Sequence, residues 1–311
     1  MSERFLVTGA YGCIGAWVLR ELVHEGTEVV AADAGSDDRR VAALLDPADL
    51  REIRFVRADV SSPEDVGALF ETEPTHVIHL AALQVPACRT DPVRGAQVNV
   101  VGTVAMLAAA AAAGIRTPVA YASSAAAFAA VDGGSTAPAE PSGHPDTHYG
   151  IYKLANEESA RVFAAEADLP SIGLRPYVVY GPGRDQGLTS APTRAMLAAA
   201  RGERFVVPYS GRSQLQYAPD VAAAFVAAAR SAYSGATVVN VPGVSASVDE
   251  IVAAIEEAAP EVRGRIEVSG PPLPFPPELD TSAFVSVVGE APVTPLGDGV
   301  AATIEHFRRV A

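Results

Sequence analysis

The chain has 311 residues, of which 49% are hydrophobic and 19% are charged, so it has enough apolar side chains for a folded core and is not intrinsically disordered. This length predicts one large α/β unit or two domains. Acidic residues outnumber basic residues by 37 to 23, and the net charge of −14 argues against general binding to nucleic acid or to an anionic membrane.

Short apolar strands alternate with helices through the first half of the chain. Because crossover helices cover both faces of a parallel sheet, this alternation predicts an α/β fold with a Rossmann-type, doubly wound parallel sheet. Strands are predicted at residues 4–8, 28–32, 53–56, 76–79, 118–122 and 171–174. Helices are predicted at residues 16–24, 63–70, 92–113 and 149–167.

The alternation ends after Arg175. Helices are predicted at residues 193–201, 220–232 and 248–258, with a strand at 237–241 and a proline-rich segment at 271–277. This strand and the helix before it are expected to return to the first sheet, and the proline-rich segment is expected to be a rigid surface loop rather than a ligand for a proline-binding module. The predicted domains are an NAD-binding domain, residues 1–175 with 219–243, and a smaller C-terminal substrate-binding cap, residues 176–218 with 244–311.

A glycine-rich loop, residues 9–15 (GAYGCIG), follows the first strand and opens the first helix. Glycine lets the backbone approach a pyrophosphate, which the free N–H groups of the helix N-terminus bind. Asp33 ends the second strand, where a carboxylate accepts hydrogen bonds from the ribose of adenosine and repels a 2′-phosphate. This pattern predicts NAD as the cofactor; a tight turn beside a solvated Asp is the alternative. Arg39 and Arg40 are candidate partners of a 2′-phosphate, but a solvated charge cluster is favoured.

Tyr149 and Lys153 lie four residues apart and therefore on the same face of one predicted helix. Lys153 is the single lysine of the chain, and a cation one turn away is expected to lower the pKa of the tyrosine, which then exchanges a proton with a substrate hydroxyl or carbonyl. Tyr152 points off this face. Ser124 follows the fifth strand, at the sheet edge where ligands bind, and is placed to hold the substrate oxygen. An ordinary helix pair and a satisfied loop serine are the alternatives.

These motifs resemble those of the extended short-chain dehydrogenases/reductases, and within them the NAD-dependent epimerase/dehydratase family. The resemblance covers nearly the whole chain and implies an NAD-dependent oxidoreductase with Ser124, Tyr149 and Lys153 as catalytic residues. The further matching segments are residues 59–60 (DV), 79–82 (HLAA), 99–103 (NVVGT), 124–128 (SAAAF) and 175–183 (RPYVVYGPG).

The resemblance also implies which residues contact each ligand, and it implies no metal. The residues expected to contact NAD are Gly9, Gly12, Cys13, Ile14, Gly15, Asp33, Asp59, Val60, Leu80, Ala81, Ala82, Asn99, Ser123, Tyr149, Lys153, Pro176, Tyr177 and Val178. The residues expected to contact the substrate are Leu83, Gln84, Ser124, Val178, Arg184 and Tyr217.

Two departures from the family pattern concern the substrate. Many nucleotide-sugar members have Asn where this chain has Val178, and an Arg-Asp pair in the segment that here reads SQLQYAPD, residues 213–220. Arg184, Arg204 and Arg212 are candidates to replace the missing groups, although a surface charge is the favoured interpretation of each; otherwise the substrate lacks a diphosphate.

The function that these observations predict is hydride transfer at a hydroxyl or carbonyl carbon of a sugar or nucleotide sugar, with epimerisation, dehydration or net oxidation as outcomes. One alternative is an NAD-dependent dehydrogenase or carbonyl reductase of a small non-nucleotide substrate. The other is a regulator that senses NAD(H) without turnover, which intact Ser124, Tyr149 and Lys153 disfavour.

Location and assembly are predicted from composition. Two cysteines, Cys13 and Cys88, make no disulfide framework, and residues 1–5 hold no apolar signal core, so a cytoplasmic protein is expected. The uncharged stretch 95–115 is long enough to span a membrane, but its polar residues and alanines favour a buried helix. The helices at 92–113 and 149–167 carry more alanine than one buried stripe needs, which predicts a homodimer with a four-helix interface; composition bias is the alternative.

Overall fold

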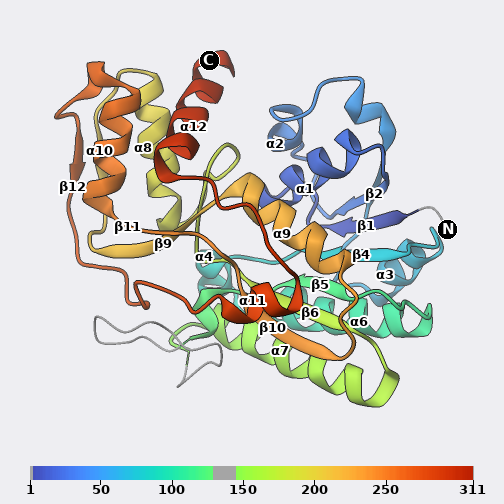
Figure 1. Ribbon diagram of the computed structural model, residues 1–311. Helices are drawn as coiled ribbons and strands as arrows, with labels where there is room; N and C mark the ends of the chain where they lie inside the picture. Colours follow the sequence, from blue (N-terminus) through green and yellow to red (C-terminus); the bar gives the residue numbers. More distant parts are fainter. Residues whose placement is uncertain (1–2, 129–144, 311) are drawn as a thin grey trace.

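The structure, a computed structural model, describes residues 3–128 and 145–310. Met1 and Ser2, the first residues of the N-terminal stretch considered above, lie outside the described residues. The described chain forms a larger part built on a parallel sheet and a smaller part that contains the C-terminal helix, and the two parts lie side by side (Figure 1).

The larger part contains a seven-stranded sheet with the order β10-β6-β5-β4-β1-β2-β3, in which every pair is parallel. The chain starts inside the sheet, runs outward to β3 and then continues on the other side from β4, which confirms the predicted doubly wound fold. The strands are β1 (Arg4–Thr8), β2 (Glu28–Asp33), β3 (Ile53–Arg57), β4 (His76–His79), β5 (Val119–Ala122), β6 (Ser171–Arg175) and β10 (Ala236–Asn240).

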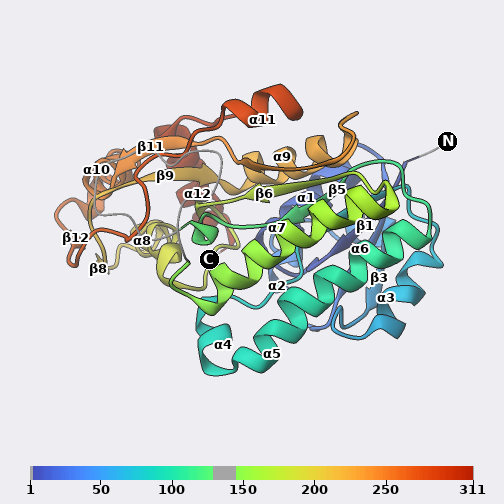
Figure 2. The same cartoon turned by 90° about the horizontal axis from the view of Figure 1, so that it is seen from below.

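Helices cover both faces of this sheet, and this explains why its interior strands are apolar along their length rather than alternating. In β1, for example, Phe5, Leu6 and Val7 are all 0% exposed. The helices on one face are α1 (Cys13–His24) and α9 (Ala218–Arg230), and those on the other face are α3 (Pro63–Phe70), α6 (Gly102–Ala112) and α7 (His148–Ala167) (Figure 2).

The helix predicted at 92–113 changes its pitch in the middle. It consists of α5 (Pro92–Ala96), a π-helical turn over Gln97–Val101, and α6. Among the described residues, Pro92–Ala112 is the one helix that is long and apolar enough to cross a membrane by length and composition. Here it packs against the sheet, with Met106 and Leu107 0% and 1% exposed, as the sequence favours.

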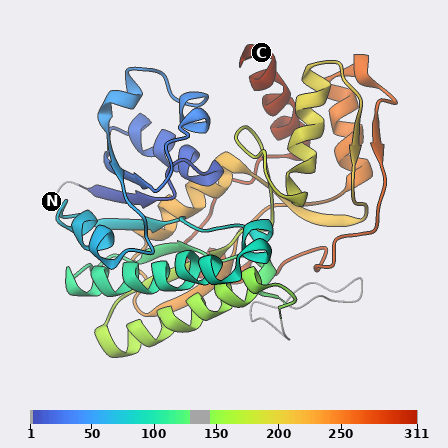
Figure 3. The same cartoon turned by 180° about the vertical axis from the view of Figure 1, so that it is seen from behind.

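The smaller part combines short strands with three helices. Its strands form a three-stranded sheet, β11-β9-β7, and a two-stranded sheet, β12-β8. Helices α8, α10 and α12 pack together beside them (Figure 3). Their bounds are β7 (Val178–Tyr180), β8 (Phe205–Val207), β9 (Arg212–Tyr217), β11 (Val244–Ser247), β12 (Ile266–Val268), α8 (Ala191–Ala200), α10 (Val248–Ala258) and α12 (Leu296–Val310).

One C-terminal segment departs from the predicted division of the chain. Helix α11 (Ser282–Val287) lies in the stretch assigned to the cap, yet Phe284 is 0% exposed in the core of the larger part, beside β10. The chain then returns to the smaller part to form α12. Two further short helices that the sequence did not indicate are α2 (Arg39–Ala42) and α4 (Val85–Thr90).

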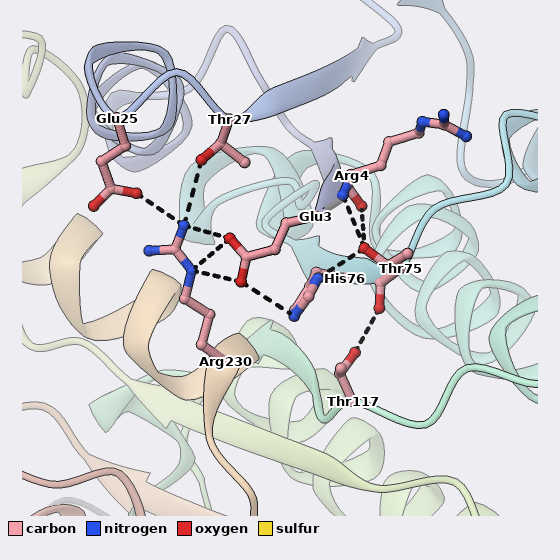
Figure 4. A network of polar contacts seen from close by, with 8 residues as sticks. All are labelled: Glu3, Arg4, Glu25, Thr27, Thr75, His76, Thr117 and Arg230. Carbon is pink, nitrogen blue, oxygen red and sulfur yellow. Dashed lines mark hydrogen bonds and ion pairs between the residues drawn. The ribbon is translucent and has the colours of Figure 1, made fainter. Parts of the chain in front are cut away.

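A network of polar contacts fixes the amino-terminal edge of the sheet (Figure 4). Arg230, at the end of α9, donates to Glu3 at 2.7 Å and to Glu25 at 2.8 Å. Glu3 in turn lies 3.8 Å from Nε2 of His76, at the start of β4. The network joins α9 to β1, β4 and the end of α1, and it leaves the opposite edge of the sheet for ligands.

Glu21, one turn before Glu25 on α1, predicts how stability depends on pH. Burial, together with the charge of Glu25, raises the pKa of Glu21 to about 7. An unfolded chain loses this proton near pH 4.3, so stability falls as the pH rises from about 4.5 to 7. Glu21→Gln should raise the free energy of unfolding by about 1 kcal/mol at pH 8 and change it little at pH 5.

Urea denaturation at the two pH values measures this effect. The matched control is Glu71→Gln, because Glu71 is exposed and its replacement should leave stability unchanged at both pH values. An equal effect of Glu21→Gln at pH 5 and pH 8 would contradict the prediction.

Candidate active site

The glycine-rich loop between β1 and α1 is packed too closely for other residues. Gly9 has a φ of +70°, and a Cβ there would lie 2.6 Å from the backbone nitrogen of Ala81. A Cβ on Gly15 would lie 2.3 Å from the carbonyl oxygen of Gly9. α1 begins after Gly12 without a side-chain cap, so its first N–H groups are free to bind an anion. The loop therefore fits the pyrophosphate of a dinucleotide.

Asp33, at the end of β2, is held against this loop. Its Oδ2 accepts a hydrogen bond from the backbone N–H of Tyr11 at 3.0 Å, and its Oδ1 accepts one from Gly35 at 2.9 Å. These bonds fix the carboxylate beside the loop, and its remaining lone pairs are able to accept from ribose hydroxyls.

The sequence favours Arg40 as a solvated surface charge, but in the structure Arg40 makes specific contacts. It donates to the carbonyl oxygens of Tyr11 and Gly183, both at 3.0 Å, and to the carboxylate of Asp185 at 2.7 Å. It therefore ties the glycine loop to the segment that follows β7. Arg39 does remain at the surface, where it pairs with Asp37.

A cavity of about 680 Å³ opens where the carboxyl ends of the strands meet the smaller part. A second cavity, of about 300 Å³, adjoins it, and Leu83 and Arg40 are among the residues that line this second cavity. The predicted residues that line the larger cavity are Gly9, Gly12, Cys13, Ile14, Gly15, Leu80, Ala82, Gln84, Ser123, Ser124, Tyr149, Lys153, Pro176, Tyr177 and Arg184.

Asp33 and Ala81 flank the loop, and five other predicted residues line neither cavity. Three of these have structural partners instead. Asp59 pairs with Arg94 at 2.6 Å, and Val60 is 5% exposed. Asn99 is 0% exposed, and its amide group bonds the backbone N–H and C=O of Leu83 at 2.7 and 2.9 Å. Asn99 thus positions the Leu83 loop from behind.

The two other residues belong to the smaller part. Val178, in β7, is 0% exposed, and its neighbour Val179 lines the cavity instead. Tyr217 packs against Tyr180, with ring centroids 5.4 Å apart, and lies outside the cavity wall. Neither side chain lines a cavity here, Val178 because it is buried and Tyr217 because it packs, partly buried, against Tyr180, and their contact with a ligand stays a prediction.

The three predicted catalytic residues meet at one end of the cavity. Thr147 caps α7 by accepting from the N–H of Gly150 at 3.0 Å, which places Tyr149 in the first helical turn. Nζ of Lys153 lies 5.4 Å from the centroid of the Tyr149 ring and donates to the carbonyl oxygen of Ala122 at 2.6 Å. The hydroxyl of Tyr149 is hydrogen-bonded to Ser124.

The pKa of Tyr149 shifts opposite to the expected direction. Burial raises it, because the phenolate loses solvation, while the hydrogen bond with Ser124 and the charge of Arg184 act to lower it. Lys153 is 3% exposed, and burial lowers its pKa to about 8. Lys153 therefore still carries its proton at neutral pH.

A buried ion pair supports α7 from the side. Glu157, one turn after Lys153, accepts from Nε and Nη2 of Arg175 at 2.8 and 2.7 Å and also from the hydroxyl of Ser123. Glu157 and Arg175 are 6% and 1% exposed. The ion pair joins α7 to the ends of β5 and β6. Sequence spacing places Glu157 on the same helix face as Lys153, but Arg175 comes to face it only in the tertiary structure.

The segment after β7, residues 181–189, forms a strap along one wall of the cavity. The carbonyl oxygen of Pro182 accepts from Nε1 of Trp17 at 2.9 Å, and Nη2 of Arg184 donates to Thr189 at 2.9 Å. Of the three candidate arginines, Arg184 lines the cavity, whereas Arg204 and Arg212 pair with glutamates at the surface.

The sequence did not indicate several lining residues because they meet only in the tertiary structure. The segment expected to be a surface loop contributes Leu273, Pro274 and Phe275 to the cavity wall. The other unpredicted lining residues are Val85, Pro86, Arg89, Thr90, Ala122, Ala125, Ala126, Thr147, Val179, Gly187, Leu188 and Thr189.

Comparison with known proteins places these features in a family. The model of the NAD dependent epimerase/dehydratase family matches residues 5–241. The UDP-glucose 4-epimerase of Mycolicibacterium smegmatis is 31% identical over 323 residues, which cover 98% of each chain. The crystal structure of a UDP-glucose 4-epimerase from Thermotoga maritima, with UDP-glucose, has a TM-score of 0.85 and 25% identity over 99% of both chains.

Two further structures show the range of the similarity. MoeE5 in complex with UDP-glucose and NAD has a TM-score of 0.81 and 30% identity over 99% of both chains. An L-threonine dehydrogenase from Clostridium difficile has a TM-score of 0.87 over 99% of this chain and 98% of its own, but only 20% identity, so it shows the fold alone.

Because the Glu157–Arg175 pair is buried, we expect a substitution that removes one of its charges to lower the stability of the fold considerably. Glu157→Gln keeps the shape of the side chain but removes the charge that faces the guanidinium of Arg175, and it should lower the free energy of unfolding by about 3 kcal/mol. The matched control is Glu158→Gln, because Glu158 is 62% exposed where it pairs with Arg161, and its loss should cost no more than about 0.5 kcal/mol. Urea denaturation of both variants compares them; equal costs would contradict a structural role for the pair.

Proposed function

This chain belongs to the NAD-dependent epimerase/dehydratase family, and we propose that it inverts a hydroxyl-bearing carbon of a hexose attached to a nucleoside diphosphate. The observation that carries the proposal is the meeting of Ser124, Tyr149 and Lys153 in a cavity that opens onto the glycine-rich loop. The full-length match to UDP-glucose 4-epimerases supports the same reaction class.

The chain's own residues supply the sites for binding and proton transfer. The glycine-rich loop and α1 would hold the pyrophosphate of NAD, Asp33 the adenosine ribose, and Lys153 the nicotinamide ribose. NAD, when bound, accepts a hydride from the substrate carbon and returns it. Tyr149 accepts the proton of the substrate hydroxyl as the C–O bond becomes a carbonyl, and it gives the proton back when the carbonyl is reduced on its other face.

Two neighbouring groups act on the pKa of Tyr149. The hydrogen bond with Ser124 and the charge of Arg184 both favour the phenolate, against the effect of burial on the pKa. The same hydroxyl of Ser124 is placed to hold the substrate oxygen.

Dehydration receives less support from this site. Elimination of water needs an acid for the leaving hydroxyl and a base for the carbon-bound proton, besides Tyr149. Within the described part of the chain, no Asp, Glu or His side chain lines the larger cavity. After Ser124 the loop continues with Ala125, Ala126 and Ala127, which are unable to transfer protons.

Tyr149→Phe tests the proposed mechanism. It should lower kcat by about 100-fold or more, because the proton transfer is lost, while NAD binding is unchanged. The substrates to screen are UDP-glucose, UDP-glucuronic acid and the free sugars, with both the isomerised product and NADH measured. The matched control is Tyr152→Phe, because the hydroxyl of Tyr152 donates to the carbonyl oxygen of Pro92 at 2.8 Å, outside the cavity. Wild-type turnover in Tyr149→Phe would refute the assignment.

We propose that the protein works as a cytoplasmic homodimer. Cys13 and Cys88 are both free thiols, as expected in a reducing compartment. Val93 and Val101, on the helix that runs from α5 to α6, are 69% and 46% exposed, and Ile151 and Val162, on α7, are 50% and 40% exposed. The members of each pair are eight and eleven residues apart, so each pair lies on one helical face. A second copy that covers both faces would bury all four side chains.

Light scattering tests the dimer. The wild type should have twice the mass of a single chain at micromolar concentration, and Val162→Glu should shift it toward the monomer, because the interface would bury the new charge. The matched control is Val206→Glu, since Val206 is 49% exposed on β8, away from these helices. A monomeric wild type would rule out the dimer, and dissociation by Val206→Glu would place the interface elsewhere.

A further inference from the structure

Arg40 lies beside the carboxylate that is expected to select the cofactor. Both side chains bond the main chain of Tyr11: Oδ2 of Asp33 accepts from its N–H, and Nη1 of Arg40 donates to its carbonyl oxygen, each at 3.0 Å. The two charges favour opposite cofactors, because a carboxylate at the end of the second strand repels a 2′-phosphate and a nearby arginine accommodates one. The state of Arg40 therefore bears on the choice between NAD and NADP.

Each of the three nitrogen atoms of the Arg40 guanidinium already has a partner. Nε donates to the carbonyl oxygen of Gly183, Nη1 to Tyr11, and Nη2 to the carboxylate of Asp185 at 2.7 Å. Arg40 and Asp185 line the second cavity together with part of the glycine-rich loop, so the pair faces a space that a ligand is able to enter. Asp185 belongs to the strap, 145 positions after Arg40, and sequence spacing gives no sign of the contact.

Carboxylates also surround the other charged groups near this position. Arg39 donates from Nε and Nη2 to the two carboxylate oxygens of Asp37, both at 2.7 Å, and its side chain is 82% exposed. Burial raises the pKa of the Tyr11 hydroxyl, and the negative charges of Asp38 and Asp33 raise it further. While Arg40 is neutralised by its partner in the strap, this region repels a phosphate.

We propose that Asp185 is a specificity-determining residue for the dinucleotide, because it keeps Arg40 from binding a 2′-phosphate. Asp33 repels the phosphate directly, and Asp185 withholds the guanidinium that would attract it. The preference for NAD is thus divided between the end of the second strand and a strap from the other end of the site. This role concerns the cofactor alone and is independent of which substrate the enzyme converts.

Asp33→Ala and Asp185→Asn, made singly and together, test this role. Calorimetric titration of the full chain with NAD and with NADP, after removal of bound nucleotide, gives the ratio of the two dissociation constants. Asp33→Ala alone should narrow the preference for NAD. Adding Asp185→Asn should strengthen NADP binding by about a further 10-fold or more, because the freed guanidinium gains charge-assisted hydrogen bonds to the phosphate. The affinity for NAD should stay close to that of Asp33→Ala.

Two matched controls separate the freed arginine from a general change in charge. Asp37→Asn, added to Asp33→Ala, also removes a carboxylate that pairs with an arginine, but this pair lies at the surface, and the ratio should stay as in Asp33→Ala. Arg40→Gln, added to the variant that carries both Asp33→Ala and Asp185→Asn, should abolish the gain in NADP affinity, because the guanidinium that binds the phosphate is gone.

Four results would overturn the role of Asp185. They are equal affinities of the wild type for NAD and NADP, an equal loss of both affinities in Asp185→Asn, a gain in NADP affinity that survives Arg40→Gln, and an equal gain from Asp37→Asn. The second result would mean that Asp185 only holds the strap in place. Failure of the proposed function would look different, since a protein that turns over no nucleotide sugar would give the same titrations.

Discussion

The bidentate ion pair between Glu157 and Arg175 holds the parts of the candidate active site in one arrangement. It joins the helix that carries Tyr149 and Lys153 to the ends of the strands that lead to Ser124 and Tyr177. Burying two charges is costly, and the cost is offset here because both carboxylate oxygens accept from the guanidinium and Ser123 adds a further donor. Such a pair tolerates little displacement, which is what a proton transfer between closely placed groups requires.

Local patterns predicted the part of the site that lies near the glycine-rich loop. Residues 9–15 and Asp33 belong to one strand–helix–strand unit, and Tyr149 and Lys153 share a helix, so sequence spacing alone relates them. The large sheet was predicted for the same reason, since each interior strand is buried on both faces and reads as an apolar run.

The substrate side of the cavity was not predictable in this way, because distant segments build it. Strands β8 and β12 have three residues each and pair across about sixty residues, too short and too distant for a periodic signal. Phe275 packs against Tyr177, although the chain between these two residues passes through both parts of the molecule. The pKa of Tyr149 is raised because the tertiary structure buries this residue. The sequence spacing between Tyr149 and Lys153 therefore predicted the wrong direction for the pKa shift.

Trp17 and Arg40 hold the strap beside the start of α1 through bonds to Pro182, Gly183 and Asp185. Trp17 lines neither cavity, yet its indole N–H fixes the backbone of the segment that forms the cavity wall. The shape of that wall therefore depends on a tryptophan in the first helix of the chain, and a change at Trp17 would alter the wall without removing any group that faces the cavity.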